Sequence, residues 1–277
     1  MEVFKRILNF YINSSIHVAL SAYALALITL IQFDVNYDKQ SLYFVFYATI
    51  TGYNFVKYFG VAKFHHRSLA GWLKAIQVFS LAAFFALCFF AFQLELDTLI
   101  LIAILGVMTF LYAIPLLPRT YFIDDQKNLR QISGLKIYVI GLVWTLATVI
   151  LPLINNKVAI NVNVIIVSVQ RFLIVIALML PFEIRDLNYD SLKLGTIPQK
   201  IGVKNTKGIG VLLLGVFVLL EFLKDEFSSK IMWSTVIITT ITLLFLVFSH
   251  KSQSKFYSAF WVESIPVMWL GILLVFG

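Results

Sequence analysis

Charged residues are scarce in this chain of 277 residues: Asp, Glu, Lys and Arg make up 13% of it, whereas 60% is hydrophobic. Soluble domains carry about a quarter charged residues, so this composition excludes an ordinary soluble protein. The sequence also lacks the alternation of apolar and polar residues that a membrane β-barrel needs. We therefore predict an all-α, polytopic membrane protein.

Cysteine is nearly absent as well. The single Cys88 lies in an apolar run, so no internal disulfide can form and a core position is the simplest interpretation. The first residues carry Lys5 and Arg6 but no small-residue cleavage pattern, and we expect the first helix to be retained rather than removed as a signal peptide.

The apolar runs are continuous and about 20 residues long, which is enough to cross a hydrocarbon core of about 30 Å as helices. We predict a bundle of nine transmembrane helices in one transmembrane domain, residues 1–277. The predicted spans are 14–33, 41–60, 70–92, 97–114, 136–154, 160–181, 207–223, 231–249 and 257–276.

The basic residues are distributed unevenly between the two sides of the membrane. Most of the 22 Lys and Arg fall in the N-terminal segment and the even-numbered loops, and the odd-numbered loops hold only Lys39, Lys157, Lys224 and Lys230. By the positive-inside rule, the N-terminus is cytoplasmic and the C-terminus is outside. This asymmetry explains the net charge of +8 without a nucleic-acid partner. We expect a bacterial inner-membrane protein whose polar site faces the cytoplasm.

Three carboxylates stand at helical spacing after the span that ends at Pro181. Glu183, Asp186 and Asp190 occupy positions i, i+3 and i+7, which share one face of a helix. Three hard oxygen donors at the mouth of a membrane bundle predict a Mg²⁺ site for a phosphorylated lipid.

This segment resembles the second aspartate motif of the UbiA-type intramembrane prenyltransferases, in which Asp-x-x-Asp-x-x-x-Asp is followed by a Gly and then by Thr-x-Pro-x-x-x-Gly. Asp186 and Asp190 match, and Glu183 replaces the first Asp. The tail of the motif is matched by Gly195, Thr196, Pro198 and Gly202. The family also has nine transmembrane helices, an inside N-terminus and a Tyr-x-x-Pro segment, here Tyr112 to Pro115.

The family's other motif, Asn-x-x-x-Asp-x-x-x-Asp, is incomplete. Asn54 matches, but Tyr58 and Ala62 stand at the two Asp positions, and Leu116 replaces a family Lys. No acidic residue occurs between Asp38 and Glu95. Half of the family's Mg²⁺ clamp on the diphosphate is therefore missing.

Three explanations of this departure stay open. Basic residues could contact the phosphate oxygens directly beside a single Mg²⁺, because cations can stabilise a departing phosphate. Asp124 and Asp125 could supply metal ligands instead, although their stretch looks solvated. Alternatively, the ancestral reaction has been lost.

The resemblance implies a prenyltransferase that moves an isoprenoid chain from a prenyl diphosphate to a lipophilic acceptor, such as an aromatic one, among the membrane lipids. Asp186 and Asp190 are the expected catalytic residues and, with Glu183, the expected Mg²⁺ ligands. The expected substrate-binding residues are Asn54, Lys57, Lys63, Arg67, Tyr112 and Lys193. The alternatives are an altered or inactive relative that binds an isoprenoid or a phosphorylated lipid, and a transporter. The sequence does not indicate an oligomeric state.

Arg171 and Glu263 are charged residues inside predicted spans. Because an unpaired charge is costly in the bilayer, we expect them to pair and to join the sixth and ninth helices.

Overall fold

The computed structural model describes residues 2–58, 71–113, 134–188, 195–225 and 228–275, and within these ranges it is helical and contains no strand. The α-helices are α1 (Glu2–Asn13), α2 (Ile16–Gln32), α3 (Lys39–Tyr58), α4 (Gly71–Ala91), α5 (Leu96–Ala113), α6 (Leu135–Thr145), α7 (Leu151–Asn155), α8 (Val162–Asp186), α9 (Ile197–Leu219), α10 (Ser229–Val247) and α11 (Ile265–Val275). Two single-turn π-helices, η4 (Leu146–Ile150) and η7 (Tyr257–Val262), and the 3₁₀ turn η6 (Leu220–Leu223) complete them. The predicted all-α class is confirmed.

Six helical segments are long and apolar enough to cross a membrane: Gly71–Ala91, Leu135–Asn155, Val162–Asp186, Ile197–Leu223, Ser229–Val247 and Tyr257–Val275. The bent pair formed by Arg6–Asn13 and α2, with an angle of 54°, makes a seventh if it counts as one span. The other two predicted spans coincide with α3, which has polar residues at both ends, and with α5, whose apolar part is shorter. The chain is an integral membrane protein, and the count of nine spans stays a prediction.

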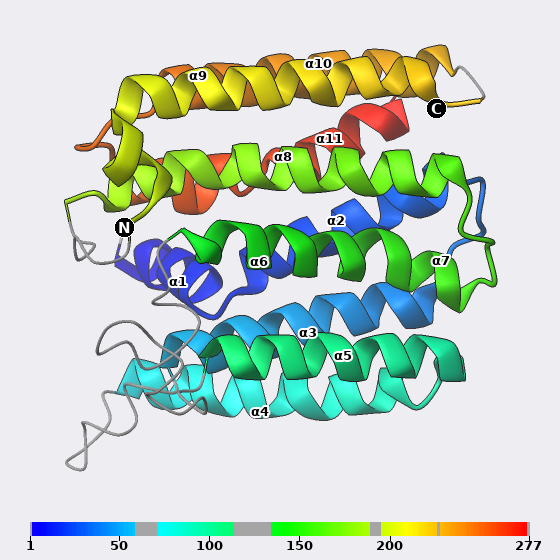
Figure 1. Ribbon diagram of the computed structural model, residues 1–277. Helices are drawn as coiled ribbons and strands as arrows, with labels where there is room; N and C mark the ends of the chain where they lie inside the picture. Colours follow the sequence, from blue (N-terminus) through cyan, green and yellow to red (C-terminus); the bar gives the residue numbers. More distant parts are fainter. Residues whose placement is uncertain (1, 59–70, 114–133, 189–194, 226–227, 276–277) are drawn as a thin grey trace, which may run out of the picture.

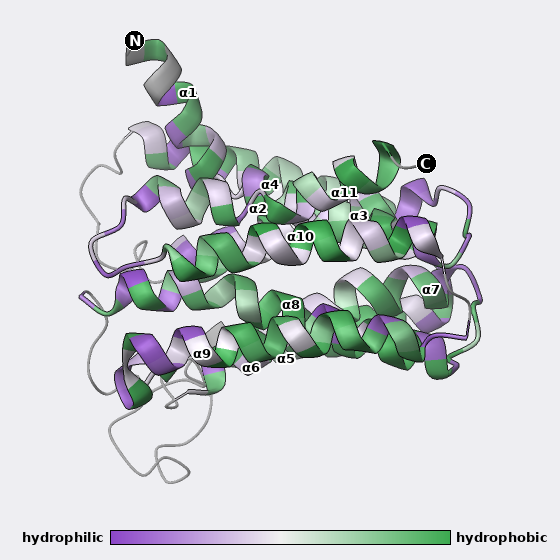
Figure 2. Cartoon of the chain, turned by 90° about the horizontal axis from the view of Figure 1, so that it is seen from above, coloured by the Kyte–Doolittle hydropathy of each residue, from purple (hydrophilic) through white to green (hydrophobic). Residues whose placement is uncertain are grey.

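The long helices run side by side, with the N-terminus at one end of the bundle and the C-terminus at the other (Figure 1). Helix α8 is central: 61% of its most apolar window is buried, against 17% for α4. The outer faces are strongly apolar (Figure 2), with exposed side chains such as Phe84, Phe85 and Phe89 on α4 and Leu212 on α9. Exposed apolar surface of this extent fits contact with lipid rather than with water.

The main core lies between α2, α6, α8, α9, α10 and α11. Helix α9 approaches α8 and α10 closely at Gly210, where a Cβ atom would lie 2.8 Å from Leu180 Cδ1 and closer still to Leu246. Leu180 and Leu246 are both fully buried. Any side chain at position 210 would therefore require these two leucines to move.

Prolines explain where two of the helices open into π-helices. Pro152 has no backbone N–H, so the carbonyl of Thr148 loses its usual helical partner four residues on. The Thr29 hydroxyl of α2 donates to this carbonyl at 2.8 Å. Pro266 likewise has no N–H for the carbonyl of Val262, the last residue of η7, which lies four residues before it.

Arg171 is the largest fully buried side chain and is held by neutral groups of α2. Its guanidinium donates to the Leu25 carbonyl at 2.7 Å and to the Thr29 hydroxyl at 3.1 Å, and it lies 5.6 Å from the ring centre of Trp269. The predicted pair with Glu263 is therefore wrong.

The two charges lie at different depths in the membrane. The Ser21 hydroxyl of α2 donates to the backbone carbonyl of Glu263, one helical turn before the Leu25 carbonyl that accepts from Arg171. Arg171 therefore lies about one helical turn farther along α2 than Glu263. Arg185 follows Arg171 by 14 residues, or about 21 Å along α8.

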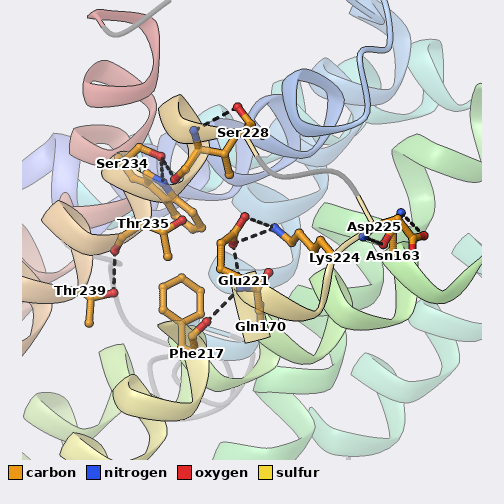
Figure 3. Close-up of polar contacts among 12 residues, drawn as sticks. Asn163, Gln170, Phe217, Glu221, Lys224, Asp225, Ser228, Ser234, Thr235 and Thr239 are labelled. Atoms are coloured by element: carbon orange, nitrogen blue, oxygen red, sulfur yellow. Dashed lines mark hydrogen bonds and ion pairs between the residues drawn. The ribbon is translucent and has the colours of Figure 1, made fainter. Parts of the chain in front are cut away.

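A separate buried network lies at the C-terminal end of α9, beside the N-terminal half of α8 (Figure 3). Lys224 Nζ lies 2.8 Å from both carboxylate oxygens of Glu221, and Gln170 Nε2 donates to Glu221 at 3.0 Å and to the Phe217 carbonyl at 2.9 Å. Burial lowers the pKa of Lys224, and the Glu221 carboxylate opposes that shift. These contacts satisfy a buried acid without a ligand.

Candidate functional site

Among the described residues that the sequence singled out, Asn54, Lys57, Glu183 and Asp186 lie at one end of the bundle. There the C-terminal ends of α3, α5 and α8 lie beside the N-terminal ends of α2, α6 and α9 (Figure 1). One side of this end of the bundle is formed by α8 and the other by α3.

The acidic side belongs to α8, which continues through Asp186. Glu183 and Asp186 are therefore helical and share a face, as their spacing predicted. Glu183 is 3% exposed, and its Oε2 accepts a hydrogen bond from the backbone nitrogen of Ile197 at 3.3 Å. Asp186 Oδ1 is 2.7 Å from Arg185 Nε, and this guanidinium lies 5.4 Å from the ring centre of Phe182.

The Gly-Thr-x-Pro segment after the acids forms the start of α9. Gly195 adopts a positive φ of 51°, and Thr196 is the N-cap, whose backbone nitrogen donates to Gln199 Oε1 at 3.0 Å. Pro198 occupies the first turn, where its missing N–H costs no helical hydrogen bond. Gly202 has φ 77° and ψ 163°, a conformation open mainly to glycine, and produces a kink. Each residue of the motif tail thus has a role in forming the start of α9, through its backbone conformation or its capping position.

On the α3 side, Asn54 is buried and makes three hydrogen bonds. Its Oδ1 accepts from Ser15 Oγ at 2.8 Å, and its Nδ2 donates to the Ser14 carbonyl at 2.9 Å and to Ser80 Oγ at 2.8 Å. Both of its donors are therefore used to join α3 to α4 and to the break between α1 and α2. One lone pair of its carbonyl oxygen remains for a ligand.

Tyr58, which stands at the first missing Asp position, also has a structural partner. Its hydroxyl donates to the Asn13 carbonyl at 2.9 Å, and its ring packs edge-on against Trp72. Tyr58 therefore joins the end of α3 to the end of α1 and to the start of α4.

Lys57 is exposed and lies one helical turn from Asn54. Its Nζ donates to Ser15 Oγ at 2.9 Å and lies 5.8 Å from the ring centre of Tyr53. Ser15 has a left-handed φ of 64°, which is unusual for a residue with a side chain. The ammonium is therefore held in place at the mouth of the bundle.

Several predicted site residues lie outside the part of the chain that the structure describes. These are Lys63, Arg67, Asp190 and Lys193. The backbone of Tyr112 belongs to the last turn of α5, but its side chain also lies outside the description. Their expected roles stay predictions.

The described donors can be compared with what Mg²⁺ requires. Glu183 and Asp186 supply hard carboxylate oxygens of the kind that Mg²⁺ prefers. Within the described ranges, no group of three or more His, Cys, Asp or Glu could hold a metal ion, and the third expected ligand, Asp190, lies beyond them. The donor chemistry fits Mg²⁺, and the metal remains a prediction.

Sequence reasoning missed two members of this site. Glu263 was expected to lie deep in the bundle beside Arg171, and the Ser14–Ser15 break between α1 and α2 gave only the weak signal of two adjacent serines. Pro266, three residues after Glu263, marks the opening of the helix there. Both features contact α2.

The helices are arranged like those of a UbiA-type membrane prenyltransferase of known structure. The particular solved structure that the chain resembles is digeranylgeranylglyceryl phosphate synthase, a synthase described in membranes. The TM-score is 0.56 over 100% of this chain and 97% of that chain, with 17% sequence identity. No family model matches the sequence, and no curated protein matches it. The predicted resemblance is thus confirmed as a likeness of fold.

Proposed function

We propose that the chain is a UbiA-like prenyltransferase. It moves an isoprenoid chain from a prenyl diphosphate to a lipophilic acceptor, such as an aromatic one, within the membrane. The observation that supports this most is the likeness of fold over the whole chain, with Glu183 and Asp186 on one face at the end of α8 and the Thr196–Gly202 turn beside them.

The residues take roles that follow from their chemistry. Glu183, Asp186 and Asp190 would hold Mg²⁺, which, when bound, neutralises the charge of the departing diphosphate. Lys57, Lys63, Arg67 and Lys193 would contact phosphate oxygens, which compensates for the acids missing from the first motif. Asn54 and Tyr112 would border the substrate.

The orientation follows from the distribution of basic residues. We place the N-terminus and the site on the cytoplasmic side of a bacterial inner membrane, because most Lys and Arg fall in the loops on that side.

A second candidate is a relative that binds an isoprenoid or a phosphorylated lipid without transferring it. Two observations favour it: Asn54 uses both of its donors within the protein, and Asp186 is engaged by Arg185. The transporter alternative loses support, because Arg171 is held by the Leu25 carbonyl and Thr29 rather than by a titratable partner.

The test is transfer by the purified protein, incubated with labelled prenyl diphosphates, Mg²⁺ and a lipid extract. Mg²⁺-dependent transfer that is lost in Asp186→Ala and Asp190→Ala supports the enzyme. Asp225→Ala is the control, because Asp225 contacts Asn163 at the opposite end of the bundle. Binding of prenyl diphosphate without turnover supports the second candidate, and the absence of both binding and transfer overturns the proposal.

A further inference from the structure

Ser15 forms the turn between α1 and α2, and its backbone conformation is unfavourable for a residue with a side chain. Its φ of 64° and ψ of 17° lie in the left-handed region, which glycine adopts at little cost. At this turn the chain bends by 54°, and the Ser15 carbonyl accepts from the backbone nitrogen of Ala19 at 3.1 Å to begin α2. The turn by itself would favour glycine, so the reason for a serine lies in its side chain.

The hydroxyl of Ser15 joins two residues of α3. Ser15 is completely buried, and its Oγ donates to Asn54 Oδ1 at 2.8 Å while it accepts from Lys57 Nζ at 2.9 Å. Asn54 and Lys57 lie one helical turn apart. A hydroxyl has one hydrogen to donate and two lone pairs that accept, so the bond to Asn54 leaves the lone pairs of Oγ for the ammonium of Lys57.

This contact determines where the charge of Lys57 lies. A lysine side chain is long and flexible, whereas the Lys57 ammonium is held against Ser15 and lies 5.8 Å from the ring centre of Tyr53. An ammonium group has three N–H donors, and one of them is directed at Ser15. The other two suit the oxygen atoms of an anion.

We propose that Ser15 is a positioning residue of the site: it places the Lys57 ammonium against the diphosphate group of the substrate, and Asn54 fixes the direction of its hydroxyl. The inference rests on the proposed function for the class of ligand. It gives the first motif, which lacks both of its acids, a fixed cation in their place. Ser15 itself does not contact the substrate and acts through Lys57.

The consequence for binding follows from the freedom of the lysine side chain. Without the Ser15 hydroxyl, Lys57 samples more rotamers and has to be ordered when the anion binds. Ordering one long side chain at a binding site corresponds to about three- to tenfold in affinity. Substitution of Ser15 by a neutral residue leaves the net charge unchanged, so a loss of this size does not arise from the overall charge of the site.

The experiment measures the affinity of the full-length protein in detergent for inorganic diphosphate by titration calorimetry, at a constant concentration of Mg²⁺. Ser15→Gly and Ser15→Ala should both bind diphosphate about three- to tenfold more weakly than the wild type. Their unfolding temperatures should differ, because glycine relieves the left-handed conformation and alanine does not. An equal loss of affinity in two variants of unequal stability supports the hydroxyl as the cause.

A double-mutant cycle separates positioning from a general structural effect. Lys57→Gln should by itself weaken the binding of diphosphate by about tenfold. Adding Ser15→Gly to Lys57→Gln should produce no further loss, because Ser15 acts through the ammonium that is already gone. Two losses that simply add would show that Ser15 acts on the fold rather than on Lys57, and would overturn the inference.

Ser80→Ala is the matched control. Ser80 Oγ accepts from Asn54 Nδ2 at 2.8 Å, so this variant removes a hydrogen bond to the same asparagine and leaves the contact between Ser15 and Lys57 in place. Its affinity for diphosphate should equal that of the wild type. An equal loss in Ser80→Ala would show that any loosening of α3 weakens binding, and would overturn the assignment to Ser15.

The inference is also overturned if folded Ser15→Gly binds diphosphate as tightly as the wild type, or if Lys57→Gln does. Should one Ser15 variant fail to fold, the affinity of the other decides. The proposed reaction fails independently, through absent prenyl transfer by the wild type while the binding of diphosphate still depends on Ser15 and Lys57.

Discussion

Glu183 of α8 and Ile197 of α9 are joined by a hydrogen bond from the backbone nitrogen of Ile197 to the carboxylate, 3.3 Å long. Ile197 is the first residue of α9, so its N–H has no partner within the helix, and the carboxylate lies at the positive end of the helix dipole. Glu183 therefore connects the acidic face of α8 to the start of the next helix, in addition to its proposed role as a metal ligand.

Glu183→Gln and Glu183→Ala should separate these two roles. The amide oxygen of Gln can still accept from Ile197, so Glu183→Gln should keep the unfolding temperature close to that of the wild type while lowering Mg²⁺-dependent prenyl transfer by about 10²-fold or more. Glu183→Ala should in addition destabilise the protein by about 1 kcal/mol, because the helix start loses its acceptor. Thermal unfolding in detergent and the transfer assay measure the two effects, and full activity of Glu183→Gln would contradict the metal role.

Arg171→Ala should destabilise the protein by about 3 kcal/mol, because it leaves a cavity and removes the hydrogen bonds to α2. The affinity for inorganic diphosphate should not change, since Arg171 lies about 21 Å along α8 from Arg185. The control is Lys157→Ala, which removes an exposed ion pair with Glu95 and should leave the unfolding temperature unchanged. Weaker binding of diphosphate by folded Arg171→Ala would show that this residue reaches the substrate.

Gly210→Val should destabilise the bundle by about 1–3 kcal/mol, because the new side chain would overlap the buried Leu180 and Leu246. Gly215→Ala is the matched change in the same helix, where a Cβ atom meets nothing within 4 Å. It should be neutral or stabilising by about 0.5–1 kcal/mol, because alanine favours the helix. Equal unfolding temperatures for the two variants would contradict the close packing of α9 on α8 and α10.

Features set by local patterns could be predicted from the sequence. The continuous apolar runs indicated helices in a membrane, and the helical spacing of Glu183 and Asp186 placed them on one face. The predicted span 207–223 overlaps α9, although the helix begins ten residues earlier, at Ile197. These inferences hold because helix formation, capping and insertion into lipid depend on residues close together in the chain.

The partners of the buried charges could not be predicted in the same way. Arg171 and Glu263 both interrupt apolar runs, and the sequence alone offered each as the partner of the other. The structure places Arg171 against Leu25 and Thr29, and the backbone carbonyl of Glu263 against the Ser21 hydroxyl. A hydropathy pattern does not specify which helices are neighbours or at what depth their side chains meet.

The sequence by itself determined that this is a helical membrane protein with an acidic face at the end of one span, because apolar length and helical period are local properties. Only the tertiary structure decided that the last helical segment packs Glu263 against α2 apart from Arg171. That arrangement depends on Pro266, which follows the π-helix η7, and on the packing of this segment against α2 through Ser21 and His17. Such long-range contacts arise from how all the helices fill the bundle together, so no single segment encodes them.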